Sequence, residues 1–373
     1  MTSKERLMLA LHKEKPDRVP VTFHQWQQYH LDHFMGGMSP LEAFKSMGMD
    51  AAIQYLGAMG QFYLPDSDQD AISTPEWKVE GKVLDPNPDG KVMRFTVHTP
   101  EGDLTYKTEA DPTTTWITEY MLKRHADLDL IEKYMPVPKL DKPYVSKLYD
   151  EIGDDGILRG FVWLDQGGCW QQACCWMDVQ QLIIEAIDNP DWMHHLLQVI
   201  LDRKLRFVEE SLRGARFDLV ETGGGAGSDT VISPAMHREF CLPYDQKLHK
   251  ALHDAGQMTS YHICGGVMHL MDMITENGTD AHETLPPAAI GGNITDPNKV
   301  HEVLGGKVCL IGGMNQHHVL TLGTKEEIRA EVRHLFEGYG KDGGYIMSTA
   351  DHFFDTNVEN IRFYAEAARE CVY

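Results

Sequence analysis

Residues 259–266 read Thr-Ser-Tyr-His-Ile-Cys-Gly-Gly, and the fold of the chain can be worked out from this pattern. The first six residues predict a β-strand, and this strand runs directly into two glycines. The same order, a short apolar run followed by polar or glycine-rich residues, recurs at 160–168, 217–223, 308–315 and 344–352. Many strands that share one polar end are typical of a barrel, whereas an open doubly wound sheet concentrates its signal at one switch point.

Amphipathic segments separate these strands and predict helices at 3–14, 178–212, 234–255, 267–277, 298–304, 325–338 and 356–370. The second of them is broken near Asn189-Pro190, and further strands are predicted at 18–23 and 279–283. Strands and helices that alternate at this spacing indicate parallel βαβ units. We therefore expect one α/β domain over residues 1–373, a (β/α)8 TIM barrel with its working site at the C-terminal mouth of the strands.

Residues 78–108 depart from that alternation. Short runs of alternating apolar residues surround two turn sequences, Asn-Pro-Asp-Gly at 87–90 and Pro-Glu-Gly-Asp at 100–103. This pattern predicts a β-hairpin or meander inserted on the barrel, because the segment is too short to be stable as a domain of its own.

Charge and composition exclude several classes of partner. The chain has a net charge of −22, from 56 acidic and 34 basic residues, and such a surface repels nucleic acid and anionic lipid. No apolar stretch is long enough to predict a secretion signal or a membrane span. Seven cysteines in a chain without a predicted leader read as reduced thiols. We expect a cytoplasmic protein that acts on a small molecule or a complementary protein.

His262 and Cys264 are the first candidates for a metal site. Alternate residues of a strand face the same side, so both side chains are expected to point toward the barrel axis near its mouth. An imidazole and a thiolate that converge in this way suit zinc. The alternative is that both are ordinary buried core residues.

A catalytic zinc ion needs a third protein ligand and an open position. Cys309 offers a soft ligand, although it lies deep in its strand and could be a core residue. Other candidates at strand ends are Glu221, Glu283, Asp351 and His352. Glu221 could also orient a ligand or donate a proton, and each of these polar groups could instead be solvated or capping.

Aromatic residues crowd the loops that follow two of the strands. Trp26 and Tyr29 follow the first strand, whereas Trp163 and Trp170 follow a later one. A mouth lined by such side chains suits a flat, weakly polar ligand, and the alternative is ordinary packing beneath long loops.

Several segments along most of the chain resemble the uroporphyrinogen decarboxylase superfamily. The matching segments are 4–6 with 17–21, 233–234 with 238–244, 291–293, 312–315 and 359–361. The resemblance implies a (β/α)8 barrel, in agreement with the strand pattern.

The superfamily resembled has two main branches, and the sequence favours one of them. Decarboxylases hold a carboxylated tetrapyrrole with arginines of a motif similar to RQAGRY, but residues 25–30 here are Gln-Trp-Gln-Gln-Tyr-His. The cobalamin-linked zinc methyltransferases carry H-x-C followed by a late cysteine, and His262 and Cys264 match its first two positions. Ala350-Asp351-His352 stand where the late cysteine is expected, so the third ligand stays open between Cys309 and the polar residues named above.

The resemblance implies a zinc methyltransferase that carries out anaerobic O-demethylation. It would move a methyl group from a methyl ether, with an aromatic ether favoured, to the Co(I) corrinoid (cobalamin) of a partner protein. Glu221 or Asp351 would protonate the leaving oxygen or orient a ligand, His352 would act beside them, and Glu283 would join the aromatic residues around the substrate. The alternatives are a tetrapyrrole decarboxylase, a methylcorrinoid:thiol methyltransferase and a non-catalytic pigment-binding module. A homodimer is expected only because barrels often dimerise.

Overall fold

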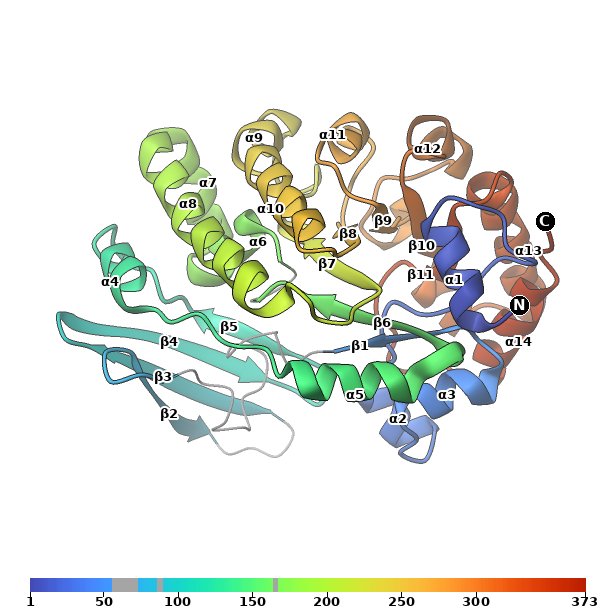
Figure 1. Ribbon diagram of the computed structural model, residues 1–373, viewed down its shortest axis with the longest axis horizontal. Helices are drawn as coiled ribbons and strands as arrows, with labels where there is room; N and C mark the ends of the chain where they lie inside the picture. The colour runs from blue at the N-terminus through green and yellow to red at the C-terminus, as the bar shows by residue number, and fades with distance from the viewer. Residues whose placement is uncertain (56–72, 86–89, 164–166) are drawn as a thin grey trace.

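A curled, parallel seven-stranded sheet forms the centre of the molecule in the computed structural model, which describes residues 1–55, 73–85, 90–163 and 167–373 (Figure 1). Its strand order is β1-β6-β7-β8-β9-β10-β11, and all neighbours are parallel. The strands are β1 (Ala51–Gln54), β6 (Gly156–Phe161), β7 (Leu219–Gly223), β8 (Thr259–His262), β9 (Ala281–Thr284), β10 (Cys309–Met314) and β11 (Tyr345–Thr349). This arrangement agrees with the predicted barrel type, although seven strands are seen in this sheet where eight were expected.

The predicted first strand, 18–23, is present only as a short extended segment between β11 and β1. The amide of Thr22 donates to the carbonyl of Met347, and the amide of Met347 donates to the carbonyl of Pro20, both at 2.9 Å. On the other side, the amide of Asp50 donates to the carbonyl of Val21 at 2.8 Å. Pro20 has no amide hydrogen, so a regular ladder cannot extend through it.

Helices surround the sheet and alternate with its strands, as predicted (Figure 1). They are α1 (Ser3–Leu11), α2 (Gln28–Phe34), α3 (Pro40–Met47), α4 (Asp127–Tyr134), α5 (Lys142–Ile152), α6 (Cys169–Trp176), α7 (Val179–Asp188), α8 (Pro190–Phe207), α9 (Pro234–Phe240), α10 (Leu242–Asp254), α11 (Met271–Glu276), α12 (Pro297–Leu304), α13 (Lys325–Leu335) and α14 (Val358–Arg369). The predicted break at Asn189 is confirmed: it ends α7, and Pro190 opens α8. None of the helices in the described ranges is both long and apolar enough to cross a bilayer.

A small apolar cluster closes the N-terminal end of the strands. Leu7 and Leu11 of α1 pack there against inward-facing residues that stand at or near the start of their strands. These residues are Ala52, Ile157, Leu219, Ala281, Cys309, Ile311 and Ile346. Helix α1 begins at a capping box in which Thr2 and Glu5 bond each other's backbone amides. Since α1 seals this end, a ligand has to enter from the C-terminal end.

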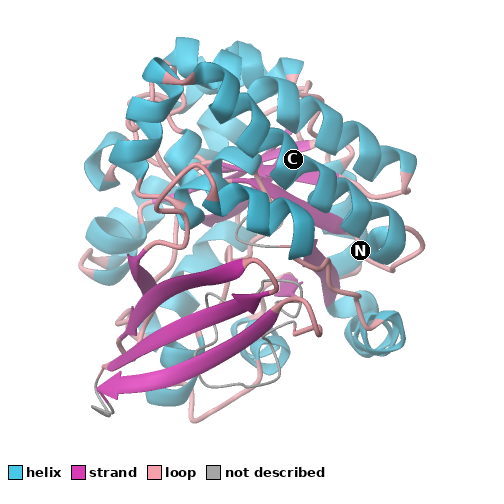
Figure 2. Cartoon of the chain, turned by 90° about the vertical axis from the view of Figure 1, so that its left-hand side faces the viewer, coloured by secondary structure: helices cyan, strands magenta, loops and turns pink. Residues whose placement is uncertain are grey.

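The predicted insertion is confirmed and is larger than expected. Strands β2 (Lys78–Asp85), β3 (Lys91–Thr99), β4 (Gly102–Ala110) and β5 (Thr115–Glu119) form a separate antiparallel meander at one side of the molecule (Figures 1 and 2). Phe95 and Tyr106 pair across β3 and β4, and their rings stack at 4.6 Å on the buried face. The first predicted turn lies largely at 86–89 and the polar strand end of β6 at 164–166, both outside the described residues.

Candidate active site

Polar residues form the inward-facing layer directly above the apolar cluster. Arg159, Glu221 and Glu283 each stand two residues after an apolar member of that cluster on their own strands, so they face the same way. His262 ends the adjacent strand β8 and joins them. All four residues are at most 2% exposed. Charged groups are rarely buried to this degree without partners, so the layer is a candidate site.

Arg159 holds the two carboxylates side by side. Its Nη2 donates to Oε2 of Glu221 at 2.8 Å and to Oε2 and Oε1 of Glu283 at 2.5 and 2.8 Å. Nδ1 of His262 lies 3.4 Å from Oε1 of Glu221 and 3.4 Å from Oε1 of Glu283. The site therefore contains two acidic groups that both contact one permanent cation and one titratable imidazole.

The surroundings move the pKa values of these groups in opposite directions. Burial, together with the charge of Glu283, raises the pKa of Glu221 well above its ordinary value. Burial also acts to raise the pKa of Glu283, but Arg159 and His262 outweigh it and hold that pKa well below the ordinary value. For His262, burial is outweighed by Glu221, Cys264 and Glu283, so its pKa is well raised. The cluster thus keeps protons on Glu221 and His262 while Glu283 stays ionised beside Arg159.

His24 completes the cluster from the extended N-terminal segment. Its Nδ1 lies 3.9 Å from Oε2 of Glu283, and its ring centroid is 4.8 Å from that of His262. Its backbone carbonyl accepts a hydrogen bond from Nε2 of Gln54 at 2.8 Å, which fixes the segment. Burial lowers the pKa of His24 well below its ordinary value, so this imidazole is neutral and available as a ligand.

These donor atoms fit a divalent metal ion such as zinc. One atom each from His24, Glu221, His262 and Glu283 lies within 4.8 Å of all the others. Tetrahedral ligands of zinc stand about 3.4 Å apart, given metal bonds of about 2.1 Å. The separations of 3.4 Å between His262 and the two carboxylates match that value. Oε1 of Glu221 is buried without a hydrogen-bond donor among the described residues, which leaves it able to bind a cation.

The two cysteines predicted as ligands lie in different places. Strand β8 ends at His262, so Cys264 is in the loop that follows it, half-buried, and it interacts with His262. Its Sγ lies close to Gly225, where an added Cβ would stand 2.5 Å from the sulfur. Cys309 is fully buried at the start of β10, where it pairs with Ala281, one inward layer below Glu283. The geometry thus brings carboxylates and His24, rather than Cys309, to His262.

Asp351 and His352 follow β11 at the mouth, and the structure brings His352 to the cluster. The ring of His352 lies 5.1 Å from that of His24, and its Nδ1 is 2.6 Å from Nε2 of Gln27. Oδ1 of Asp351 is 4.0 Å from Nε2 of His352. Burial lowers the pKa of His352, although Asp351 opposes this shift, so the ring is neutral.

Most of the aromatic residues predicted to bind a substrate are packed into the walls. Trp26, Trp163 and Trp170 are 3% exposed or less. Trp26 donates to Nδ1 of His30 at 3.0 Å, and Trp170 donates to the carbonyl of Ala226 at 3.0 Å. Tyr29 is half-buried and stacks on His33 with ring centroids 4.1 Å apart.

Three residues of the site were not singled out from the sequence: Arg159, His24 and Gln27. Arg159 carried a usable signal, since it is the one charged residue in the apolar stretch Gly156–Phe161. His24 and Gln27 stand in a polar, aromatic segment and gave no signal of their own.

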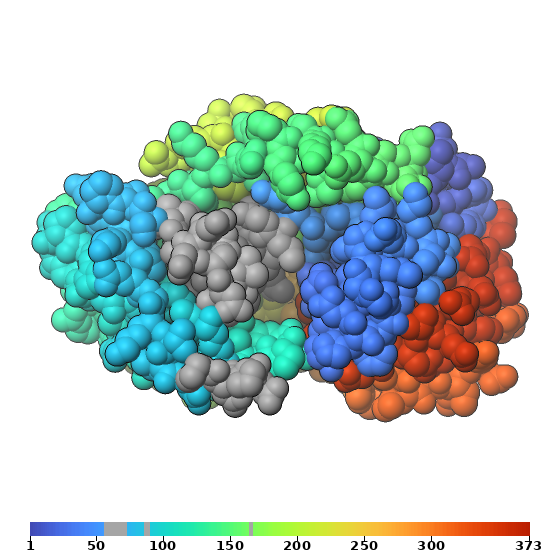
Figure 3. Space-filling view, turned by 90° about the horizontal axis from the view of Figure 1, so that it is seen from below, coloured from blue at the N-terminus to red at the C-terminus, as the bar shows by residue number. Residues whose placement is uncertain are grey.

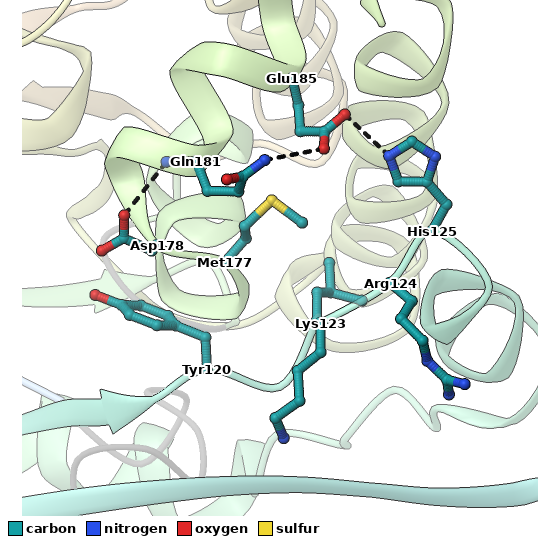
Figure 4. A pocket seen from close by; sticks show the side chains of 9 residues that line it. Tyr120, Lys123, Arg124, His125, Met177, Asp178, Gln181 and Glu185 are labelled. Atoms are coloured by element: carbon teal, nitrogen blue, oxygen red, sulfur yellow. Dashed lines mark hydrogen bonds and ion pairs between the residues drawn. The ribbon is translucent and has the colours of Figure 1, made fainter.

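A cavity of about 440 Å³ lies away from this cluster, between the end of β5 and helix α7 (Figure 4). None of its lining residues belongs to the cluster. Its polar groups already pair with one another: His125 and Gln181 contact Glu185 at 2.9 and 3.2 Å, and Asp178 caps α7. We therefore assign the chemistry to the buried cluster and not to this cavity.

Comparisons with known proteins agree with this geometry at the level of fold and family. The family model for uroporphyrinogen decarboxylase (URO-D) matches residues 102–371. A uroporphyrinogen decarboxylase of Aromatoleum aromaticum is 25% identical over 57% of this chain and 59% of its own length. One from Shewanella loihica is 27% identical over 59% and 62%. The alignments thus span about three fifths of these curated relatives.

Solved structures resemble the whole chain at low identity. A methyltransferase from Methanosarcina mazei superposes with a TM-score of 0.65 at 17% identity, covering 99% of both chains. A B12-independent methionine synthase from a Shewanella species superposes with a TM-score of 0.52 at 11% identity, covering 95% of this chain and 92% of its own. These likenesses concern the fold. Because the family model covers most of the sequence and the inward layer of polar groups stands at the strand ends, the chain belongs to the uroporphyrinogen decarboxylase (URO-D) family.

Proposed function

We propose that this protein is a zinc-dependent methyltransferase, the demethylating component of a corrinoid-linked system. It would take a methyl group from a methyl ether, preferably an aromatic one, and pass it to the Co(I) corrinoid of a partner protein. The observation that carries the proposal is the buried group His24, Glu221, His262 and Glu283, which fits a metal ion. The fold shared with the Methanosarcina mazei methyltransferase supports it. The proposal includes a single barrel domain, with segment 20–22 in the place of an eighth strand.

The metal would be held chiefly by His262, His24 and Glu221, and Cys264 interacts with His262 beside them. When bound, zinc supplies a Lewis acid that stabilises negative charge on the leaving oxygen. Arg159 keeps Glu283 ionised and fixed beside His262, so this carboxylate is placed as a further ligand. The raised pKa of Glu221 also suits the second role expected for this residue, which is to donate a proton to the leaving oxygen.

The residues around the cluster keep water away from the reacting atoms. Glu221, His262 and Glu283 are each 1% exposed, and α1 closes the opposite end of the strands. Charges in such surroundings act more strongly than in water. Asp351 and His352 stand at the open side, where a methyl donor and the acceptor protein would approach.

Tetrapyrrole decarboxylation is the second candidate, because the curated relatives carry that name. Its substrate class is polyanionic, and the inward layer already presents two carboxylates whose cation, Arg159, is engaged by both. Residues 25–30 contain no arginine to add positive charge. These features favour methyl transfer. Formation of coproporphyrinogen by the purified protein would instead establish the decarboxylase.

The test is the metal content of anaerobically purified protein, measured by elemental analysis. We expect about one zinc per chain in wild type, loss of it in His262→Ala, and retention in Cys309→Ala, which is equally buried but outside the cluster. Methyl transfer is then followed by the absorbance of reduced cobalamin with 1,2-dimethoxybenzene as donor. Metal-free wild type, or unchanged transfer by His262→Ala, would contradict the proposal.

A further inference from the structure

Gln27 and His352 meet at the mouth of the cluster although 325 positions separate them in the sequence. Nε2 of Gln27 lies 2.6 Å from Nδ1 of His352. The same nitrogen donates to Oε1 of Gln25 at 3.2 Å, which agrees with an amide whose NH2 group faces both partners. Figure 3 shows the N-terminal and C-terminal segments side by side on one face of the molecule.

The contact determines which nitrogen of His352 carries its hydrogen. An amide nitrogen has only hydrogens to offer, so Nδ1 of His352 has to accept. In a neutral imidazole the hydrogen then stands on Nε2. The contact that Nε2 makes within the described part of the chain is with Oδ1 of Asp351 at 4.0 Å, which is too long for a hydrogen bond. The His352 side chain keeps 32% of its surface exposed, so Nε2–H can meet a ligand.

Further contacts hold the two loops that carry Gln27 and His352 against each other. Nε2 of His30 donates to the carbonyl of Thr356 at 2.7 Å, while its Nδ1 accepts from Trp26. Phe23 and Phe353 pack with ring centroids 4.5 Å apart. A donor fixed in this way before a ligand arrives costs little reorganisation during the reaction.

We propose that His352, set by Gln27 with its hydrogen on Nε2, donates a hydrogen bond to the oxygen of the methyl donor and so selects donors with an oxygen leaving group. This inference rests on the proposed function. In the transfer, the bond between methyl carbon and oxygen breaks, the methyl carbon bonds to the acceptor nucleophile, and the electron pair stays on oxygen. His352 supports that charge without giving up its proton, and Gln27 acts as a positioning residue.

Gln27→Glu tests the inference, because it keeps the shape of the side chain but reverses the hydrogen bond. A carboxylate accepts from Nδ1–H, so in the neutral imidazole of His352 the hydrogen stands on Nδ1 and not on Nε2. Two-bond 1H–15N correlation spectra of ring-labelled protein report the tautomer, and the His352→Asn spectrum identifies the signals. Gln28→Glu is the matched control, because it adds the same charge at an exposed residue one position further along the chain.

We expect Nε2–H in wild type and in Gln28→Glu, and Nδ1–H in Gln27→Glu. With 1,2-dimethoxybenzene and reduced cobalamin, kcat of Gln27→Glu should fall about 100-fold, as when one oxyanion donor is removed, with zinc content unchanged. The kcat of Gln27→Met should fall less than that of Gln27→Glu, because methionine leaves both tautomers of His352 populated. Nδ1–H in wild type, or full kcat in a Gln27→Glu protein with the reversed tautomer, would overturn the inference. If wild type demethylates no methyl ether, the proposed function fails, and the assignment of His352 as a hydrogen-bond donor to the ether oxygen fails with it. The spectra still determine whether Gln27 sets the tautomer of His352.

Discussion

Replacing Arg159 by methionine tests whether this guanidinium holds the cluster together. The change removes the permanent cation that contacts both Glu221 and Glu283, and methionine fills part of the volume. Both carboxylates are 1% exposed, so neither can recover its hydration without local opening. Breaking a buried ion pair by removing one partner costs about 3–5 kcal/mol. That is a large part of the roughly 5–15 kcal/mol that stabilises a typical domain.

Urea unfolding of metal-free protein at neutral pH, followed by circular dichroism, measures this loss as a lower midpoint. Arg206→Met is the control, because Arg206 pairs with Glu210 on the exposed surface of the α8 region and should change stability by less than about 1 kcal/mol. The double variant Arg159→Met/Glu283→Gln should regain most of the loss, since the uncompensated charge is gone. Zinc should also restore stability in Arg159→Met, because a divalent ion replaces the missing cation. An Arg159→Met protein as stable as wild type without metal would refute the reasoning.

Three further expectations concern metal binding and pH. Zinc binding should release protons, because His262 and Glu221 lose the protons they hold when they become ligands. Chelator competition should therefore show a zinc affinity that increases with pH, and a zinc affinity independent of pH would contradict the assignment. Gly225→Ala should weaken zinc binding if Cys264 takes part, since the new Cβ would stand 2.5 Å from its sulfur, and unchanged affinity would remove Cys264 from the ligands. Burial raises the pKa of Asp245 to about 7, although the hydroxyl of Tyr261 donates to this carboxylate at 2.6 Å. The proton on Asp245 therefore stabilises the folded protein fully below the unfolded pKa of about 3.9, and this stabilisation is lost as pH rises through about 7. Urea midpoints of Asp245→Asn should therefore improve relative to wild type as pH rises from about 4 to about 7 and level off above it, and a constant difference would disprove the shift.

Local pattern was enough to predict most elements after residue 178 and the side of the molecule that carries the site, whereas β1 and the helices α2 to α6 were not predicted. Apolar runs of strand length, glycine-rich strand ends and the Asn189-Pro190 break are short-range signals, and β7 to β11 follow them closely. The pleat repeats every two residues, so the sequence also placed His262 on the inward face. The meander at 78–119 was recognised for the same reason, from its turn residues, although β5 was not foreseen.

The depth of each residue along the barrel axis was a property of the tertiary structure alone. Cys309 and Glu283 both face inward, but the register of β9 against β10 pairs Glu283 with Ile311 and leaves Cys309 one layer lower. Register between strands depends on how the whole sheet curls, and no single strand encodes it.

The sequence by itself determined the family, the parallel α/β architecture and the presence of a histidine and acidic residues at the strand ends. Only the tertiary structure brought Arg159 and His24 to those acids and joined Gln27 to His352. The physical reason is that the sheet curls until the N-terminal segment packs between β11 and β1, which makes neighbours of residues from opposite ends of the chain.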